Sequence, residues 1–246
     1  MAAVLAGLVA GLVATIGADV ATAPPAEARK RTWTLASPLA REVVRPGAAD
    51  RGVYDIAHVR ELQIRLRRVG VYQGPVTGRY TRPTLRAVKA FQRRVGAPAN
   101  GTVGYRTWKP LIRKTVQRRS AVPRACKAAG WHACYDRSRH QVNLYRDGTL
   151  HQSWLARGGA SHEQTRTGSF SVFRRSERHV SSLYDSPMPY AQFFSGGQAL
   201  HGSVSMIDPY DGHSHGCVNL WIEDARQLWD LTHDQPLGVH VYGAWA

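Results

Sequence analysis

Residues 201–220 read HGSVSMIDPYDGHSHGCVNL, and this stretch gathers one cysteine and three histidines within twenty residues. A thiolate is the nucleophilic form of cysteine, and a neighbouring imidazole can take the thiol proton. Gly216, directly before Cys217, leaves the backbone bare enough for a substrate carbonyl to approach closely. The stretch therefore indicates covalent catalysis by a cysteine. We expect the thiol to give its proton to an imidazole, which leaves a thiolate–imidazolium ion pair.

Other interpretations of this stretch stay open. One of them is a zinc site, because histidine and cysteine both bind zinc and the stretch offers His201, His213, His215 and Cys217. Their spacing, however, fits no zinc-binding pattern known to us. Cys217 can also be an inert buried thiol, which is a common state of free cysteine. His213 on its own is typical of a solvated loop histidine. We expect no metal and no organic cofactor.

The N-terminus has the character of an export signal. The first eighteen residues carry no charge and are small or apolar, and Ala26-Glu27-Ala28 offers a small-x-small cleavage site. We expect a signal peptide over 1–28, cleavage after Ala28 and a secreted protein. An uncleaved membrane anchor is the alternative, but the charge-free run ends at Asp19, a little short of the roughly twenty apolar residues that span a bilayer.

Three cysteines in an exported protein favour one disulfide and one free thiol. Cys126 and Cys134 lie close together in the sequence, whereas Cys217 stands alone among the histidines. We predict a Cys126–Cys134 bridge, with two free thiols as the alternative. In either case Cys217 is the odd cysteine, and an unpaired thiol in an oxidising compartment is at risk of oxidation unless it has a function.

The net charge of +16 is unevenly distributed. Lys30 to Arg124 contains 22 basic and 4 acidic residues, whereas Ala125 to Ala246 contains 10 and 11. The step marks a domain boundary near residue 124 and indicates an anionic partner for the first module. For an exported protein that partner is an anionic cell-wall surface or a lipid head group rather than nucleic acid. The chain has 28 Arg against 5 Lys, so the excess of positive charge can also come from an arginine-rich composition alone.

Residues 29–52 show no periodicity, and we expect a flexible tether there. From Val53 onward apolar residues recur three and four apart, which predicts two amphipathic helices, and a third short helical element includes Thr107–Leu111. The residues of the two apolar stripes are Val59, Leu62, Leu66 and Val69, then Leu85, Val88, Phe91 and Val95. We therefore place a small three-helix bundle at 53–114 and a linker at 115–125.

The period changes to two in residues 126–246. Gln141–Tyr145 and Leu150–Leu155 alternate around Asp147-Gly148, which predicts a β-hairpin. Further strands are expected at Ser169–Phe173 and Val239–Tyr242, and one helix at Ile222–Leu231. The fold class is therefore multidomain α plus β, in which a helical bundle precedes a mostly-β, sandwich-like domain.

The helical segment resembles the peptidoglycan-binding domain found beside many wall-modifying enzymes. The resemblance rests on these residues: Leu62-Gln63-x-x-Leu66, Gly70-Val71-Tyr72, Val76-Thr77-Gly78-Arg79-Tyr80, Thr84, Ala87-Val88-Lys89-Ala90-Phe91-Gln92, Asn100-Gly101-Thr102-Val103-Gly104 and Thr107-Trp108. Arg79 and Tyr80 depart from the family, which has an acidic or polar residue in that turn. The resemblance implies binding to the peptide stems or glycan of the wall. A spacer bundle without a ligand is the alternative.

The stretch from Tyr135 to Tyr242 resembles the L,D-transpeptidases with a YkuD-like catalytic domain. His201-Gly202, followed by Ser214-His215-Gly216-Cys217-Val218-Asn219, matches their catalytic signature. Thr165-Arg166 departs from the usual Thr-Pro. The resemblance implies that Cys217 is the nucleophile and His201 the base, whose second ring nitrogen we expect to bond a backbone carbonyl near Gly202 or Ser203.

The resemblance also assigns supporting roles. We place the amides of His215, Gly216 and Cys217 in an oxyanion hole, because a tight turn lets successive amides converge on one point. Ser214 and Asn219 are expected to hold this turn by hydrogen bonds to the backbone.

By the same resemblance Tyr190 and Met188 lie near the substrate. A packed aromatic is the alternative for Tyr190.

Taken together, the resemblances imply a monomeric, secreted cell-wall enzyme. It would cross-link peptidoglycan stem peptides through a cysteine thioester and release terminal D-alanine. Carbapenem-type β-lactams would be its inhibitors. An L,D-carboxypeptidase acting on the same stems and a non-catalytic wall-binding protein are the alternatives.

Overall fold

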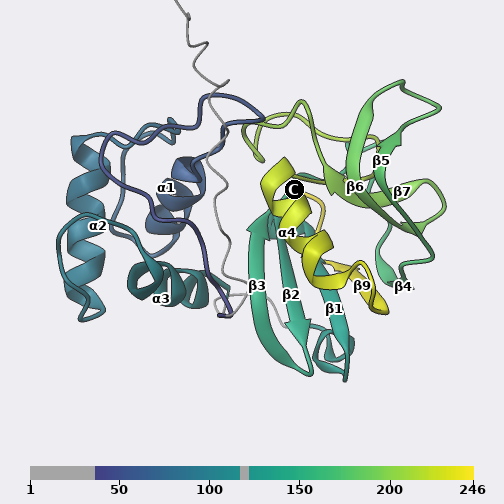
Figure 1. The fold of residues 1–246 in the computed structure, drawn as a ribbon, viewed down its shortest axis with the longest axis horizontal. Helices are drawn as coiled ribbons and strands as arrows, with labels where there is room; N and C mark the ends of the chain where they lie inside the picture. The colour runs from purple at the N-terminus through teal and green to yellow at the C-terminus, as the bar shows by residue number, and fades with distance from the viewer. Residues whose placement is uncertain (1–36, 117–121) are drawn as a thin grey trace, which may run out of the picture. The chain divides into compact units, whose positions relative to one another are not determined.

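The structure, a computed structural model, describes residues 37–116 and 122–246 (Figure 1). The predicted signal peptide, the first part of the tether and the middle of the linker lie outside these ranges. The described residues belong to one compact unit. Within the described ranges, no helix combines the length and the apolar character needed to cross a membrane.

Three helices form the first module: α1 Val59–Arg68, α2 Arg82–Arg94 and α3 Tyr105–Val116. The predicted apolar stripes meet in one core, where Leu62, Phe91 and Trp108 are fully buried. Gly70 and Gly96 follow the first two helices with φ of +78° and +68°, the left-handed conformation that commonly ends a helix. The predicted three-helix bundle is therefore confirmed.

The described part of the expected tether, residues 37–52, is packed rather than free. Leu39 and Val44 are each 1% exposed and belong to the core of the helical module. Val44 also exchanges backbone hydrogen bonds with Val103 at 3.1 and 2.8 Å. A flexible tether is wrong for this part, because isolated apolar residues gain burial from the helices without showing any period of their own.

Two mixed sheets build the second domain. The five-stranded sheet has the order β3-β2-β1-β9-β4, with β1 Trp131–Asp136, β2 Gln141–Arg146, β3 Thr149–Leu155, β4 Gly168–Ser171 and β9 Leu237–Tyr242. The four-stranded sheet has the order β5-β6-β7-β8, with β5 Arg174–Val180, β6 Pro187–Ser195, β7 Gln198–Gly202 and β8 Val218–Leu220. Only the pairs β1–β9 and β7–β8 are parallel among these strands.

The hairpin and the single helix appear where the sequence predicts them. β2 and β3 pair antiparallel around Asp147 and Gly148, whose φ angles of +50° and +73° suit a two-residue hairpin turn. The helix α4 spans Ile222–Thr232. Its Ala225 and Leu228 share one hydrophobic core with both sheets, and this arrangement confirms the mostly-β, sandwich-like domain.

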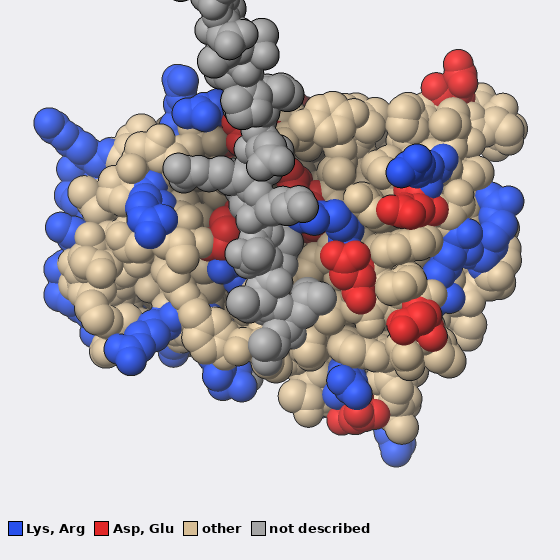
Figure 2. All heavy atoms as spheres, in the orientation of Figure 1, with Lys and Arg blue, Asp and Glu red and all other residues tan. Residues whose placement is uncertain are grey.

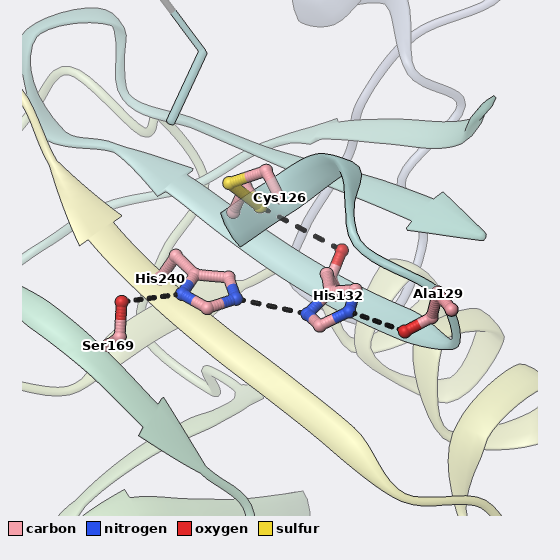
Figure 3. The surroundings of a disulfide bond; sticks show 6 residues. Cys126, Ala129, His132, Ser169 and His240 are labelled. Atoms are coloured by element: carbon pink, nitrogen blue, oxygen red, sulfur yellow. Dashed lines mark hydrogen bonds between the residues drawn. A yellow bond between two sulfur atoms is a disulfide. The ribbon is translucent and has the colours of Figure 1, made fainter. Parts of the chain in front are cut away.

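Cys126 and Cys134 form the predicted disulfide (Figure 3). A polar chain runs beside it, in which the His132 ring lies 3.0 Å from the His240 ring and His240 lies 2.9 Å from the Ser169 hydroxyl. His132 Nε2–H donates to the Ala129 carbonyl at 2.9 Å, so its Nδ1 accepts from His240 Nε2–H. This series of hydrogen bonds links the disulfide region to strands β1, β9 and β4.

The charge step is visible on the surface. Figure 2 shows Lys and Arg side chains crowded on the helical module, whereas acidic and basic side chains mix over the β-rich domain. The two parts therefore present different electrostatic surfaces to a polymer.

Candidate active site

The parallel pair β7–β8 brings His201 and Cys217 together. Leu200 lies opposite Val218 and His201 opposite Asn219, so Cys217, one residue before β8, lies beside Ala199. Residues two apart on a strand share a face, and this register places the imidazole and the thiol on the same side. Both side chains line one cavity of about 480 Å³.

His201 has a defined tautomer. Its ring is 7% exposed, and its Nδ1 lies 2.7 Å from the Gly202 carbonyl oxygen. Because a carbonyl only accepts, Nδ1 carries the proton and Nε2 keeps a free lone pair. This contact confirms the expected carbonyl partner. Burial lowers the pKa of His201 to about 4, so the imidazole is neutral at pH 7.

The Cys217 thiol lies in apolar surroundings. Its Sγ lies 3.7 Å from the Gly197 carbonyl oxygen, and it packs against the small apolar cluster that contains Met188 and Phe193. Burial raises the pKa of the Cys217 thiol, and a hydrogen bond from the Ala199 backbone only partly opposes that effect. Burial therefore disfavours both charged forms of the expected thiolate–imidazolium pair, which stays a prediction.

The turn before Cys217 is held by Ser214. The Ser214 hydroxyl donates to the Cys217 carbonyl at 2.6 Å and accepts from the Gly216 amide at 3.1 Å. Gly216 has a φ of +104°, a conformation that favours glycine. Since the Gly216 amide already donates to Ser214, the amides of His215 and Cys217 are the two remaining candidates for an oxyanion hole.

The His215 side chain points to partners that the sequence did not reveal. Its Nδ1 hydrogen-bonds the Glu163 carboxylate, and its ring stacks on Tyr184 with centroids 4.1 Å apart. Both partners come from loops far from His215 in the sequence, and neither stands in a pattern that marks it. The contacts fix the orientation of the ring at the mouth of the cavity.

The remaining predicted residues divide into two groups. Asn219 and Met188 line the cavity, and Asn219 exchanges backbone hydrogen bonds with Arg157 at 2.8 and 2.9 Å. Tyr190 is not among the lining residues, and its ring lies 6.2 Å from the ring of Trp229 on α4. Its packed position resembles the alternative for this residue, and a substrate role for Tyr190 stays a prediction.

Several further polar residues also line the cavity, and the sequence singled out only Arg166 among them, as a departure from the usual Thr-Pro. They are Arg157, Arg166, Ser181, Tyr184, Ser186, Gln198 and Ser205. In a chain with 28 arginines, one more arginine in a loop carries no signal of its own. Only the fold reveals that two of them line the cavity that contains the thiol.

A separate group of ligand-type side chains is buried at His58, Glu61 and Asp224, whose candidate ligand atoms lie within 4.8 Å of one another. The two carboxylates already form ion pairs with arginines. Arg41 lies 3.1 Å from Glu61 and 3.2 Å from Asp224, and Arg65 lies 2.6 Å from Glu61. A metal ion would add positive charge beside two guanidinium groups. We assign these five residues, the buried ionic cluster, a structural role.

Comparison with known proteins agrees with both motifs. Residues 57–111 match the peptidoglycan binding domain family PG_binding_1, and residues 130–239 match the YkuD family, the L,D-transpeptidase catalytic domain. The two matches assign a peptidoglycan-binding domain to the first of these segments and a YkuD-type L,D-transpeptidase catalytic domain to the second. The matched segments fall inside the predicted domains 53–114 and 126–246, whose exact boundaries stay predictions.

Solved structures of L,D-transpeptidases are similar to the chain. The one from Stackebrandtia nassauensis is 26% identical, with a TM-score of 0.51 over 85% of this chain and 98% of that one. The one from Xylanimonas cellulosilytica is 28% identical, with a TM-score of 0.48 over 84% and 100%. The one from Mycobacterium smegmatis is 21% identical, with a TM-score of 0.44 over 47% and 59%. No curated protein sequence matches significantly.

Proposed function

We propose that the protein is an extracytoplasmic peptidoglycan L,D-transpeptidase that uses Cys217 as its nucleophile. The observation that carries the proposal is the tautomer of His201. With Nδ1–H held by the Gly202 carbonyl at 2.7 Å, the basic Nε2 is left available in the cavity that contains the thiol. A positioned base of this kind is what a cysteine nucleophile needs.

The reaction would begin with the Cys217 sulfur attacking the carbonyl of the third residue of a donor tetrapeptide, while His201 Nε2 takes the thiol proton. The negative charge on the carbonyl oxygen would be held by the amides of His215 and Cys217. Collapse of the intermediate breaks the peptide bond, and His201 returns the proton to the leaving D-alanine amine. The product of this half-reaction is a thioester.

An acceptor amine would then attack the thioester, with His201 again taking a proton. The new amide is the cross-link, and the thiol regains its proton from His201. If water attacks instead, the same site is an L,D-carboxypeptidase. Because burial raises the pKa of the thiol, we expect the proton transfer to accompany the attack, with stabilisation of the oxyanion compensating for the raised pKa.

Two measurements test this proposal. Wild-type protein incubated with tetrapeptide muropeptides should release D-alanine and form cross-linked dimers, and Cys217→Ala should do neither. Mass spectrometry with a carbapenem should show a covalent adduct on the wild type only. If the wild-type protein gives neither product nor adduct, the chain is a wall-binding protein without catalysis.

We also propose that the helical module binds an anionic wall polymer. A groove of about 670 Å³ on this module is lined by Arg86, Lys89 and Arg93 of α2 beside Tyr72. These three cations repeat at helical spacing, and none forms an ion pair with a described carboxylate. They are free to meet the carboxylates of peptide stems.

Retention of the full-length protein on purified sacculi tests the groove. Replacing Arg86, Lys89 and Arg93 by glutamine should abolish retention at moderate salt. The matched control replaces Arg106, Arg113 and Lys114 of α3 by glutamine, which changes the net charge equally and should keep retention. Equal loss in both variants would indicate a non-specific charge effect and would contradict a defined groove.

A further inference from the structure

Arg157 is a buried arginine at the wall of the candidate active site. It is 7% exposed and lines the same cavity as His201 and Cys217. Its backbone N–H donates to the Asn219 carbonyl at 2.9 Å, and the Asn219 N–H donates back at 2.8 Å. The exchange fixes the Arg157 backbone against a residue two positions from the thiol.

The guanidinium of Arg157 contacts only neutral oxygens. One terminal nitrogen donates to the Asp211 carbonyl at 3.0 Å and the other to the Ser205 hydroxyl at 3.3 Å. Its Nε is buried without a hydrogen-bond partner among the described residues. Since a guanidinium carries five N–H groups, three remain without an acceptor in the part of the chain that the structure describes.

The other buried arginines of the described chain differ from Arg157 because they form ion pairs. Arg41 and Arg65 are also nearly inaccessible, and each has a carboxylate partner, Glu61 for both and Asp224 for Arg41. A buried cation is costly unless it is paired. Arg157 forms no ion pair with a described carboxylate, and burial lowers its pKa although the charge of Asp211 partly opposes that effect. Its missing partner is therefore expected to arrive with a ligand.

We propose that Arg157 binds the terminal carboxylate of the donor peptide, the one on the D-amino acid that leaves. This inference rests on the proposed function, because it names the part of the donor that the cavity recognises. The terminal carboxylate follows the scissile carbonyl by one residue, so the two groups enter one cavity together. An arginine suits a carboxylate because it can donate two parallel N–H···O bonds.

The consequence is specificity for a chain end. A donor with a free terminal carboxylate would pair with Arg157, whereas a stem that continues past this residue, or one that ends in an amide, would leave the cation buried and unpaired. Leaving a buried group unpaired is a strong basis for discrimination. Arg157 would be a specificity-determining residue that contacts the leaving group.

The test compares two donors that differ only at the terminus, a tetrapeptide stem ending in D-alanine and the same stem ending in D-alaninamide. Mass spectrometry gives kcat/KM for release of the last residue. We expect the full-length wild-type protein to favour the free acid at least about tenfold, as a lost charge-assisted pair implies. Arg157→Gln should bring the ratio close to one, and Arg157→Lys should give an intermediate ratio.

Arg166→Gln is the matched control. Arg166 also lines the cavity, but its guanidinium donates to the carbonyl and hydroxyl of Ser195 at 2.8 and 3.2 Å. This variant removes the same charge and should keep the preference for the acid. If Arg157→Gln slows both donors equally, Arg157 only braces the loop that carries Ser205 and Asp211, and the proposal is overturned. A wild-type protein without a preference overturns it as well.

Measuring how tightly each donor binds tests this inference independently of the proposed catalytic reaction. In the Cys217→Ala background no acylation occurs, and calorimetry measures the Kd of each donor directly. Tighter binding of the acid that disappears on adding Arg157→Gln supports the inference even if the wild type shows no turnover. Equal Kd values for acid and amide contradict it whether or not the wild-type protein is an active transpeptidase.

Discussion

Gly159 packs directly against Gly216, the glycine of the turn before the candidate nucleophile. A Cβ atom on Gly159 would lie 2.7 Å from the Gly216 Cα and 2.0 Å from the Glu163 carbonyl oxygen. Both neighbours are backbone atoms, so neither can move aside without displacing its loop. The loop after β3 therefore sets the position of the turn that would hold the oxyanion.

The first prediction follows from this contact. Gly159→Ala should lower kcat for the tetrapeptide by about 100-fold or more, because a small displacement of an oxyanion donor has an effect of that size. Circular dichroism should show a folded protein. Gly104→Ala is the control, since a Cβ there meets nothing within 4 Å, and it should keep wild-type kcat. Full activity in Gly159→Ala would mean that the turn tolerates displacement.

The second prediction concerns the reactivity of Cys217. Burial raises the pKa of the thiol and lowers the pKa of His201 to about 4, so little thiolate exists at pH 7 without substrate. The rate of alkylation by iodoacetamide should therefore rise continuously from pH 6 to pH 9. The Cys217→Ala protein supplies the background rate. A plateau already reached below pH 7 would instead reveal a thiolate–imidazolium pair.

The sequence predicted elements that carry their own local signal. The apolar stripes of α1 and α2 and the turn residues Asp147 and Gly148 each determine a short-range structure, and the structure contains all of them. Five strands were missed: β1, β5, β6, β7 and β8. β5 reads RRSERHV with most residues exposed, and β6 contains two prolines, so neither shows an alternating apolar pattern. Their pairing depends on partners elsewhere in the sheet.

The candidate site was predictable to the extent that its residues stand in one motif. Ser214, Cys217 and His201 belong to contiguous or nearby segments, and the structure places all three at one cavity. Arg157 lines the same cavity, and Glu163 hydrogen-bonds the His215 ring, both from a loop more than fifty residues before Cys217. No spacing rule in the sequence predicts that such positions lie close together. Their proximity results from the bridge between Arg157 and Asn219 and from the close approach of Gly159 to Gly216.

The third prediction concerns the effect of His201 on stability at acid pH. Burial lowers the folded-state pKa of His201 to about 4, below its ordinary value of 6.5. Between these two values the unfolded state binds the extra proton, so stability falls as the pH decreases from 6.5 to 4. The shift corresponds to about 3 kcal/mol in the free energy of unfolding.

Urea unfolding at pH 7 and pH 4 measures this effect. The wild-type protein should lose about 2 to 3 kcal/mol more than His201→Gln between the two pH values. The variant controls for the other titrating groups, because they are present in both proteins. An identical pH dependence in the two proteins would show that His201 is not desolvated in solution.

The fourth prediction concerns Asp224 in the buried ionic cluster. Its carboxylate lies 3.0 Å from the His58 ring and 3.2 Å from Arg41, and all three side chains are buried. Asp224→Asn removes one negative charge while keeping the shape, and it leaves two cations with fewer partners. Such a loss costs about 3 to 5 kcal/mol, and urea unfolding at pH 7 should show it. Arg51→Ala breaks an ion pair of 3.6 Å whose side chains are 74% and 49% exposed, and it should cost at most about 0.5 kcal/mol.

The pH dependence gives this prediction a second readout. Burial opposes the charge of His58, but the carboxylates of Glu42 and Asp224 outweigh it and raise the pKa of His58 well above its ordinary value. A raised folded-state pKa stabilises the protein fully below the unfolded-state pKa, and this stabilisation is lost as the pH rises through the folded-state pKa. The free energy of unfolding of the wild type should therefore fall on the alkaline side, and the fall should be smaller in Asp224→Asn. If Asp224→Asn matches the wild type at pH 7 and at alkaline pH, the cluster is hydrated in solution and does not stabilise the fold.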